Sequence, residues 1–94
     1  MKDRLYHTLI ERGYQEESAK TVLDDLLHLS EPLKELLNDW LDDEHTQSDY
    51  TVDVFSISKL QQERGMKYPA ALLTIDWLIK KPKEAKRSLI KGNR

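Results

Sequence analysis

The sequence contains no cysteine and only three glycines and three prolines among its 94 residues. Without thiols the chain can form no disulfide, no thiolate zinc site and no cysteine nucleophile, and the cytoplasm, a reducing compartment, is the expected location. Hydrophobic residues make up 38% and charged residues 34%. With so little glycine and proline, this composition favours a folded helical protein over a disordered chain.

Long apolar runs are missing as well. The start, MKDRLYHTLIERG, has no apolar signal-peptide core. No uncharged apolar run approaches the ~20 residues that a membrane-spanning helix needs. We therefore expect neither secretion nor insertion into a membrane.

The motifs of common catalytic and metal sites are also absent. The sequence has no GxSxG elbow and no glycine-rich phosphate loop. His7, His28 and His45 lack the spacing of paired metal ligands, and the acidic segment 39–49 lacks the glycine and closing glutamate of an EF-hand. We expect no catalytic residue, no cofactor and no metal site, and hence a protein that is not an enzyme.

Apolar residues recur at helical spacing, and leucines such as Leu5, Leu26 and Leu37 are expected in a core. Residues 44–55 have no helical period and predict the longest loop. The sequence thus predicts an all-α fold, a compact bundle of five to six short helices that forms a single domain over residues 1–94. The predicted helices are 3–12, 16–29, 30–43, 56–64, 69–80 and 82–90.

An internal repeat appears when Gly13 is set against Gly65. This offset of 52 residues aligns RGYQEESAKTVLDDLL with RGMKYPAALLTIDWLI and pairs Arg12 with Arg64. The alignment indicates two related helix-turn-helix-helix units, residues 3–43 and 56–91. The alternative is that short helices share composition by default.

The first glycine turn, in LIERGYQEESAKTVL, resembles the start of ubiquitin-associated domains. In that family a Met-Gly-Phe/Tyr loop joins two helices and precedes an alanine and leucine stripe. The matching positions here are Arg12, Gly13, Tyr14, Ala19 and Leu23. Arg12 stands where the family usually has methionine, and this departure weakens the match at the loop that would touch ubiquitin. The alternative is that packed helices commonly need a glycine between them.

The second glycine turn, in LQQERGMKYPAALLTIDWL, is similar to a DNA-binding helix-turn-helix. Leu60 and Met66 lie near two of the usual apolar positions of that motif. In the helix after the turn, however, only Thr74 and Asp76 interrupt the apolar surface between Pro69 and Ile79, whereas base reading needs arginine, lysine, asparagine or glutamine. Asp76 would also repel phosphate. Because this helix is apolar nearly all round, it is expected inside a bundle or at an interface.

Leu73 and Trp77 belong to a second apolar stripe on that helix. Either other helices of the chain cover this stripe, or another molecule does. In the second case Leu73 and Trp77 are candidate contact residues, and Tyr14 and Tyr68 at the glycine turns are further candidates. The expected function is therefore a non-catalytic protein-interaction, regulatory or self-associating module, whose partner is an unknown protein or a second copy.

Charge is divided unevenly along the chain. Residues 1–50 carry five Lys/Arg and thirteen Asp/Glu, a net charge of −8, whereas residues 51–94 carry ten and four, a net charge of +6. Either the halves attract each other, or the basic C-terminal tail, 80–94, binds an acidic partner. The alternative function is nucleic-acid binding through phosphate contacts. Its candidate residues are Lys80, Lys81, Lys83, Lys86, Arg87, Lys91 and Arg94.

Overall fold

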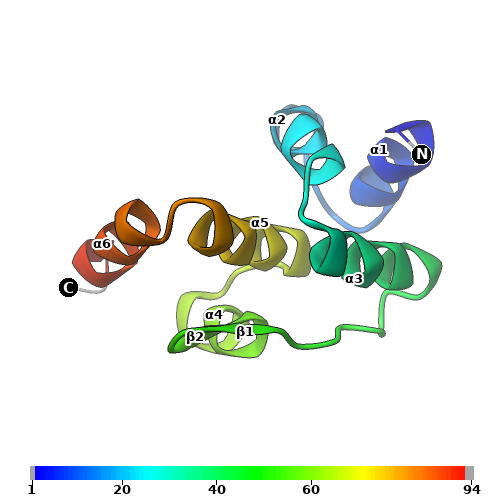
Figure 1. Cartoon of the computed structure of the whole chain (residues 1–94). Helices are drawn as coiled ribbons and strands as arrows, with labels where there is room; N and C mark the ends of the chain where they lie inside the picture. Colours follow the sequence, from blue (N-terminus) through cyan, green and yellow to red (C-terminus); the bar gives the residue numbers. More distant parts are fainter. Residues whose placement is uncertain (1, 93–94) are drawn as a thin grey trace. The chain divides into compact units, whose positions relative to one another are not determined.

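The computed structural model describes residues 2–92, with side chains to Ile90, and consists there of six helices and one short hairpin (Figure 1). The predicted all-α fold is confirmed. The chain divides into unit 1, Met1–Gln47, and unit 2, Ser48–Arg94. The expectation of one domain over the whole chain stays a prediction.

Unit 1 consists of α1 (Lys2–Glu11), α2 (Glu16–Leu27) and α3 (Glu31–Asp42). Helices α1 and α2 pack against each other. The turn between them contains Gly13, whose φ of 101° lies in the region that favours glycine. Leucines on the apolar stripes are buried as expected. The buried apolar residues of the unit are Leu5, Leu9, Ala19, Leu23, Leu26, Leu29, Leu33, Leu37, Trp40 and Leu41.

The carboxyl end of α3 is held by Arg12, which follows α1. The Arg12 guanidinium donates hydrogen bonds to the carbonyl oxygens of Trp40 and Leu41, the latter over 3.0 Å. It also lies over the Trp40 ring, 4.4 Å from the ring centroid. Carbonyls in the last turn of a helix have no donor within that helix, and the helix dipole favours a cation there. Arg12 thus caps α3.

Unit 2 begins with a hairpin of β1 (Thr51–Val52) and β2 (Phe55–Ser56). The strands are antiparallel, with Thr51 opposite Ser56 and Val52 opposite Phe55. Asp53 in the turn has a φ of 59°, a conformation that aspartate tolerates better than most residues. This pairing lies largely within the segment where the sequence predicts a loop. Two-residue strands are too short to leave an alternating pattern.

Two side chains cap the start of α4 (Ile57–Arg64). The Ser56 hydroxyl accepts a hydrogen bond from the Lys59 amide over 3.2 Å. The Asp49 carboxylate accepts from the Ser58 amide over 3.0 Å and from the Ser58 hydroxyl over 2.8 Å. Both serve amide groups that have no acceptor within the helix.

Gly65 ends α4 in the left-handed conformation, with a φ of 65°, and the chain continues into α5 (Tyr68–Lys80) and α6 (Pro82–Gly92). Helix α5 packs against both α4 and α6. Arg64 donates to the carbonyl oxygen of Leu89, near the end of α6, over 2.8 Å. The buried apolar residues of the unit are Ile57, Leu60, Tyr68, Pro69, Ala71, Leu72, Ile75, Leu78, Ala85 and Leu89.

Candidate partner-binding pocket

The four predicted contact residues differ in accessibility. Leu73 and Trp77 lie one turn apart on α5 and are half-buried, as is Tyr14. Tyr68 is only 2% exposed, and its hydroxyl donates to the carbonyl oxygen of Ser48 over 2.8 Å. Tyr68 therefore leaves almost no surface accessible to a partner. The other three keep some accessible surface, and their role as contact residues stays a prediction.

The basic residues proposed for nucleic-acid binding are only partly available as a phosphate-binding surface. Lys80 forms an ion pair with Asp76 over 2.8 Å, and Lys86 forms one with Asp53. Lys81, Lys83 and Arg87 are exposed. The side chain of Lys91 and all of Arg94 lie outside the described residues.

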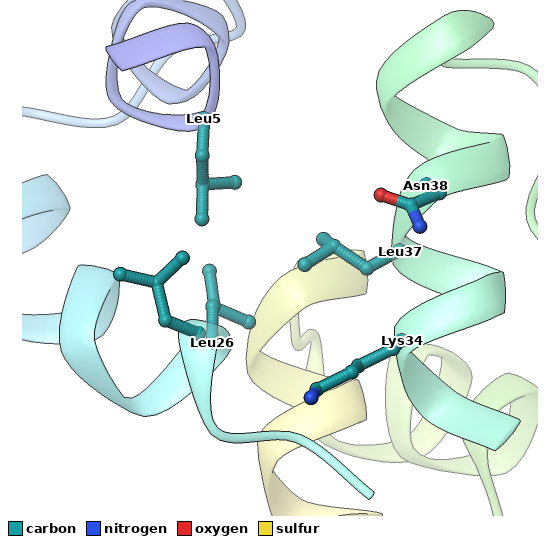
Figure 2. A pocket seen from close by; sticks show the side chains of 6 residues that line it. Leu5, Leu26, Lys34, Leu37 and Asn38 are labelled. Atoms are coloured by element: carbon teal, nitrogen blue, oxygen red, sulfur yellow. The ribbon is translucent and has the colours of Figure 1, made fainter. Parts of the chain in front are cut away.

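Unit 1 contains a pocket that the sequence does not predict. It has a volume of about 180 Å³, is partly open to solvent and is lined by residues of all three helices of the unit. Figure 2 shows Leu5, Leu26 and Leu37 converging on one space from different helices, with Lys34 and Asn38 along α3. The lining residues are Leu5, Leu26, Leu27, Lys34, Leu37 and Asn38.

The pocket has an apolar floor and a polar edge. Leu5, Leu26 and Leu37 are at most 3% exposed, whereas Lys34 is half-buried and Asn38 is exposed. The Lys34 ammonium lies 3.9 Å from a carboxylate oxygen of Glu31, a loose contact at the surface. The edge can therefore offer Asn38 and Lys34 to the polar groups of a ligand whose apolar part lies against the leucines.

The size of the pocket limits its occupant. Pockets for drug-sized ligands and cofactors measure about 300–1,000 Å³. An apolar cavity of about 150 Å³ accepts a benzene-sized molecule. At about 180 Å³, the pocket matches one branched aliphatic or aromatic side chain and is too small for a nucleotide.

Unit 1, which contains this pocket, is acidic as a whole, although the one charged residue that lines the pocket is Lys34. Residues 1–47 carry five Lys/Arg and twelve Asp/Glu, a net charge of −7, whereas residues 48–94 carry ten and five, a net charge of +5. A basic partner is therefore favoured over an acidic one in its approach to unit 1.

The leucines of the pocket were expected in the core from their helical spacing, and most of them are buried. Helical spacing predicts which side of a helix turns inward, but it does not predict whether three inward faces fill the space between them. No pattern in the sequence distinguishes Leu37, which lines the pocket, from Leu33, which does not.

Neither a cluster of metal ligands nor a membrane-spanning helix is found in the part of the chain that the structure describes. Among residues 2–92, no three His, Asp or Glu side chains lie close enough together to hold a metal ion. Across the same range, no helix has both the length and the apolar character needed to cross a bilayer.

Comparisons with known proteins identify no relative of this chain. No protein-family model, no curated protein and no solved structure matches the chain. The resemblance of the first glycine turn to ubiquitin-associated domains therefore stays a prediction from the residues alone.

Proposed function

We propose that the chain is a non-catalytic protein-interaction module whose unit 1 binds one apolar side chain of a partner. The observation that carries this proposal is the leucine-lined pocket of about 180 Å³. Apolar side chains that enter well-packed pockets supply much of the binding energy of protein interfaces. The size of the pocket favours such a side chain over a cofactor or a metabolite.

The proposed partner segment is a basic amphipathic helix. An amphipathic helix that lays its apolar face into a hydrophobic groove is a common form of peptide recognition, and the pocket has room for one side chain of such a face. The net charge of −7 on unit 1 favours lysine and arginine around that side chain. Asn38 is exposed at the edge of the pocket, where its side chain can form hydrogen bonds with polar groups of the partner helix.

Two synthetic helical peptides test the proposal. Both carry one isoleucine, flanked in the first by lysine and arginine and in the second by glutamate. The methyl resonances of Leu5, Leu26, Leu27 and Leu37 are followed by NMR as each peptide is added. We expect the basic peptide to shift these resonances with a Kd of about 0.1–1 mM, and the acidic peptide to bind at least tenfold more weakly.

A matched pair of variants serves as the control. Leu27→Trp places a larger side chain at the pocket and should weaken binding of the basic peptide. Ile10→Trp adds the same side chain on α1 at a position that does not line the pocket and is 38% exposed. Equal binding of the two peptides, or equal binding by the two variants, would contradict the proposal.

Nucleic-acid binding is the second candidate function, favoured by the exposure of Lys81, Lys83 and Arg87 in and beside α6. Phosphate contacts of this kind weaken steeply as salt is added. A titration of the protein with duplex and single-stranded DNA at low salt tests it. The absence of association under those conditions would exclude this candidate.

We also infer that the two units are copies of one helix-turn-helix-helix segment. Support comes from α2 and α5, which begin at Glu16 and Tyr68, 52 residues apart, the offset that aligns Gly13 with Gly65. Arg12 and Arg64 precede these glycines, and each donates to a carbonyl near the end of the third helix of its own unit. Similar losses of stability for Arg12→Lys and Arg64→Lys would support this inference, and a loss at only one of them would oppose it.

A further inference from the structure

Helix α6 carries an exposed isoleucine among basic side chains. Ile90 is 66% exposed, whereas Ala85 and Leu89 on the same helix are 0% and 6% exposed. At 100° per residue, Ile90 shares an arc of about 100° with the basic residues of the helix. These neighbours are Lys83, Lys86 and Arg87.

This basic face matches the partner segment that we propose for the pocket of unit 1. Ile90 offers a branched aliphatic side chain of suitable size, and Lys83 and Arg87 beside it are exposed. Unit 2, which contains α6, has a net charge of +5, and unit 1 has a net charge of −7. Ile90 therefore matches the apolar lining of the pocket, and the two units carry net charges of opposite sign.

We propose that Ile90 of one copy of the chain enters the Leu5, Leu26 and Leu37 pocket of a second copy. This inference rests on the proposed function of the pocket and names its partner. The contact joins two different surfaces, Ile90 on α6 and the pocket of unit 1. It can form once, head-to-tail, or twice between the same two copies in a two-fold dimer.

The contact is small and should be reversible. One side chain and its charged neighbours bury less surface than the roughly 1,200 Å² at the lower limit of stable interfaces. We therefore expect association at protein concentrations of about 0.1–1 mM and fast exchange between free and bound copies.

The first experiment measures self-association of the full-length chain. Sedimentation equilibrium gives the average mass, and NMR follows the methyl resonances of the pocket leucines as protein concentration is raised. We expect the mass to rise and these resonances to shift together. Ile90→Asp should reduce the association constant at least tenfold. The control is Val54→Asp, because Val54 is 68% exposed but lies in the β1–β2 turn; it should leave association unchanged.

The second experiment uses the fact that the contact joins two different surfaces. Leu27→Trp obstructs the pocket but keeps Ile90, whereas Ile90→Asp keeps the pocket. Neither variant should associate with itself. When unlabelled Leu27→Trp is added to isotope-labelled Ile90→Asp, the pocket methyls of the labelled chain should shift. If Leu27→Trp fails to fold by circular dichroism, Asn38→Trp at the exposed edge of the pocket replaces it.

Three results would overturn the inference. They are a monomer at about 1 mM protein, self-association that survives Ile90→Asp, and a mixture of the two variants in which the pocket methyls do not shift. The peptide titration distinguishes failure of self-association through Ile90 from failure of the proposed function of the pocket. If the basic peptide binds but the chain does not self-associate, the pocket binds a partner other than a second copy, and if neither occurs, both proposals are wrong.

Discussion

Arg12 links the end of α1 to the end of α3 with one side chain. Its hydrogen bonds to the carbonyl groups of Trp40 and Leu41 and its position over the Trp40 ring require a planar group with several donors. Lysine has the charge but not this geometry. In the sequence Arg12 stands out as the counterpart of Arg64 and as a departure from a methionine. Its capping role is not visible there, because the carbonyls that it caps lie 28 and 29 residues away.

Arg12→Lys should therefore lower the free energy of unfolding by about 1–2 kcal/mol, since it removes hydrogen bonds from partly buried carbonyls. The measurement is chemical denaturation followed by circular dichroism. Arg4→Lys is the control, because Arg4 also contacts α3, through an exposed ion pair with Asp42, and should cost less than about 0.5 kcal/mol. Equal losses for the two variants would contradict the capping role.

Asp49 links stability to pH at the start of α4. Partial burial by itself raises the pKa of this carboxyl group. Hydrogen bonds from the Ser58 amide and hydroxyl and from the amides of Tyr50 and Ile57 outweigh burial, so the pKa is lowered. A lowered pKa in the folded state means that the carboxylate stabilises the fold above the unfolded pKa of about 4, and that this contribution is lost as pH falls through the folded pKa.

Asp49→Asn should cost about 1 kcal/mol at pH 7, as expected for loss of a helix cap. The difference from the unmodified chain should shrink as pH falls below about 4. Thermal unfolding at a series of pH values measures it. Asp25→Asn, at an exposed position of α2, is the control. A cost at Asp49 that does not change with pH would show that the charge is not responsible.

At the scale of helices and strands, the turn residues decide what the sequence can predict. Pro69 and Pro82 lie at the predicted starts of α5 and α6, and Gly13 and Gly65 follow the ends of α1 and α4. Each acts through its own backbone, so it can be recognised without knowledge of the fold. The hairpin at 51–56 and the pocket depend on contacts between separate segments, and the sequence does not predict them.

Gly65→Ala tests this local role. A Cβ atom at Gly65 would have no atom within 4 Å, so the cost arises only from the φ of 65°. We expect a loss of about 1–2 kcal/mol, the usual cost of the left-handed conformation for a residue with a Cβ atom. Gly65→Asn should cost less, because asparagine tolerates this conformation better. Thermal unfolding of both variants measures the losses, and an unaffected Gly65→Ala variant would contradict this explanation.

For the whole molecule, the small net charge of −2 conceals an acidic unit and a basic unit. The sequence already predicts this division, because charge can be counted without a structure. The sequence does not predict which charged residues lie beside Ile90 or beside the pocket. These neighbours depend on which face of α6 is exposed and on how α1, α2 and α3 pack. Association between copies should accordingly depend on salt as well as on Ile90.

Raising the salt concentration should therefore weaken self-association. The Debye length falls from about 10 Å at 0.1 M to about 3 Å at 1 M salt, which screens exposed charges from one another. We expect the association constant from sedimentation equilibrium to fall about tenfold over this range. An association that strengthens with salt would show that apolar contact, and not charge, selects the partner.

The hydrogen bond from Tyr68 to Ser48 has a practical consequence for producing unit 2 as a fragment. Tyr68 is buried in α5, and its acceptor lies before the hairpin, beside Asp49. A fragment cut at the first strand, Thr51, would leave a buried phenol without this acceptor and α4 without its carboxylate cap. A shortened expression clone should therefore start upstream of Ser48, several codons earlier than the strands alone would suggest.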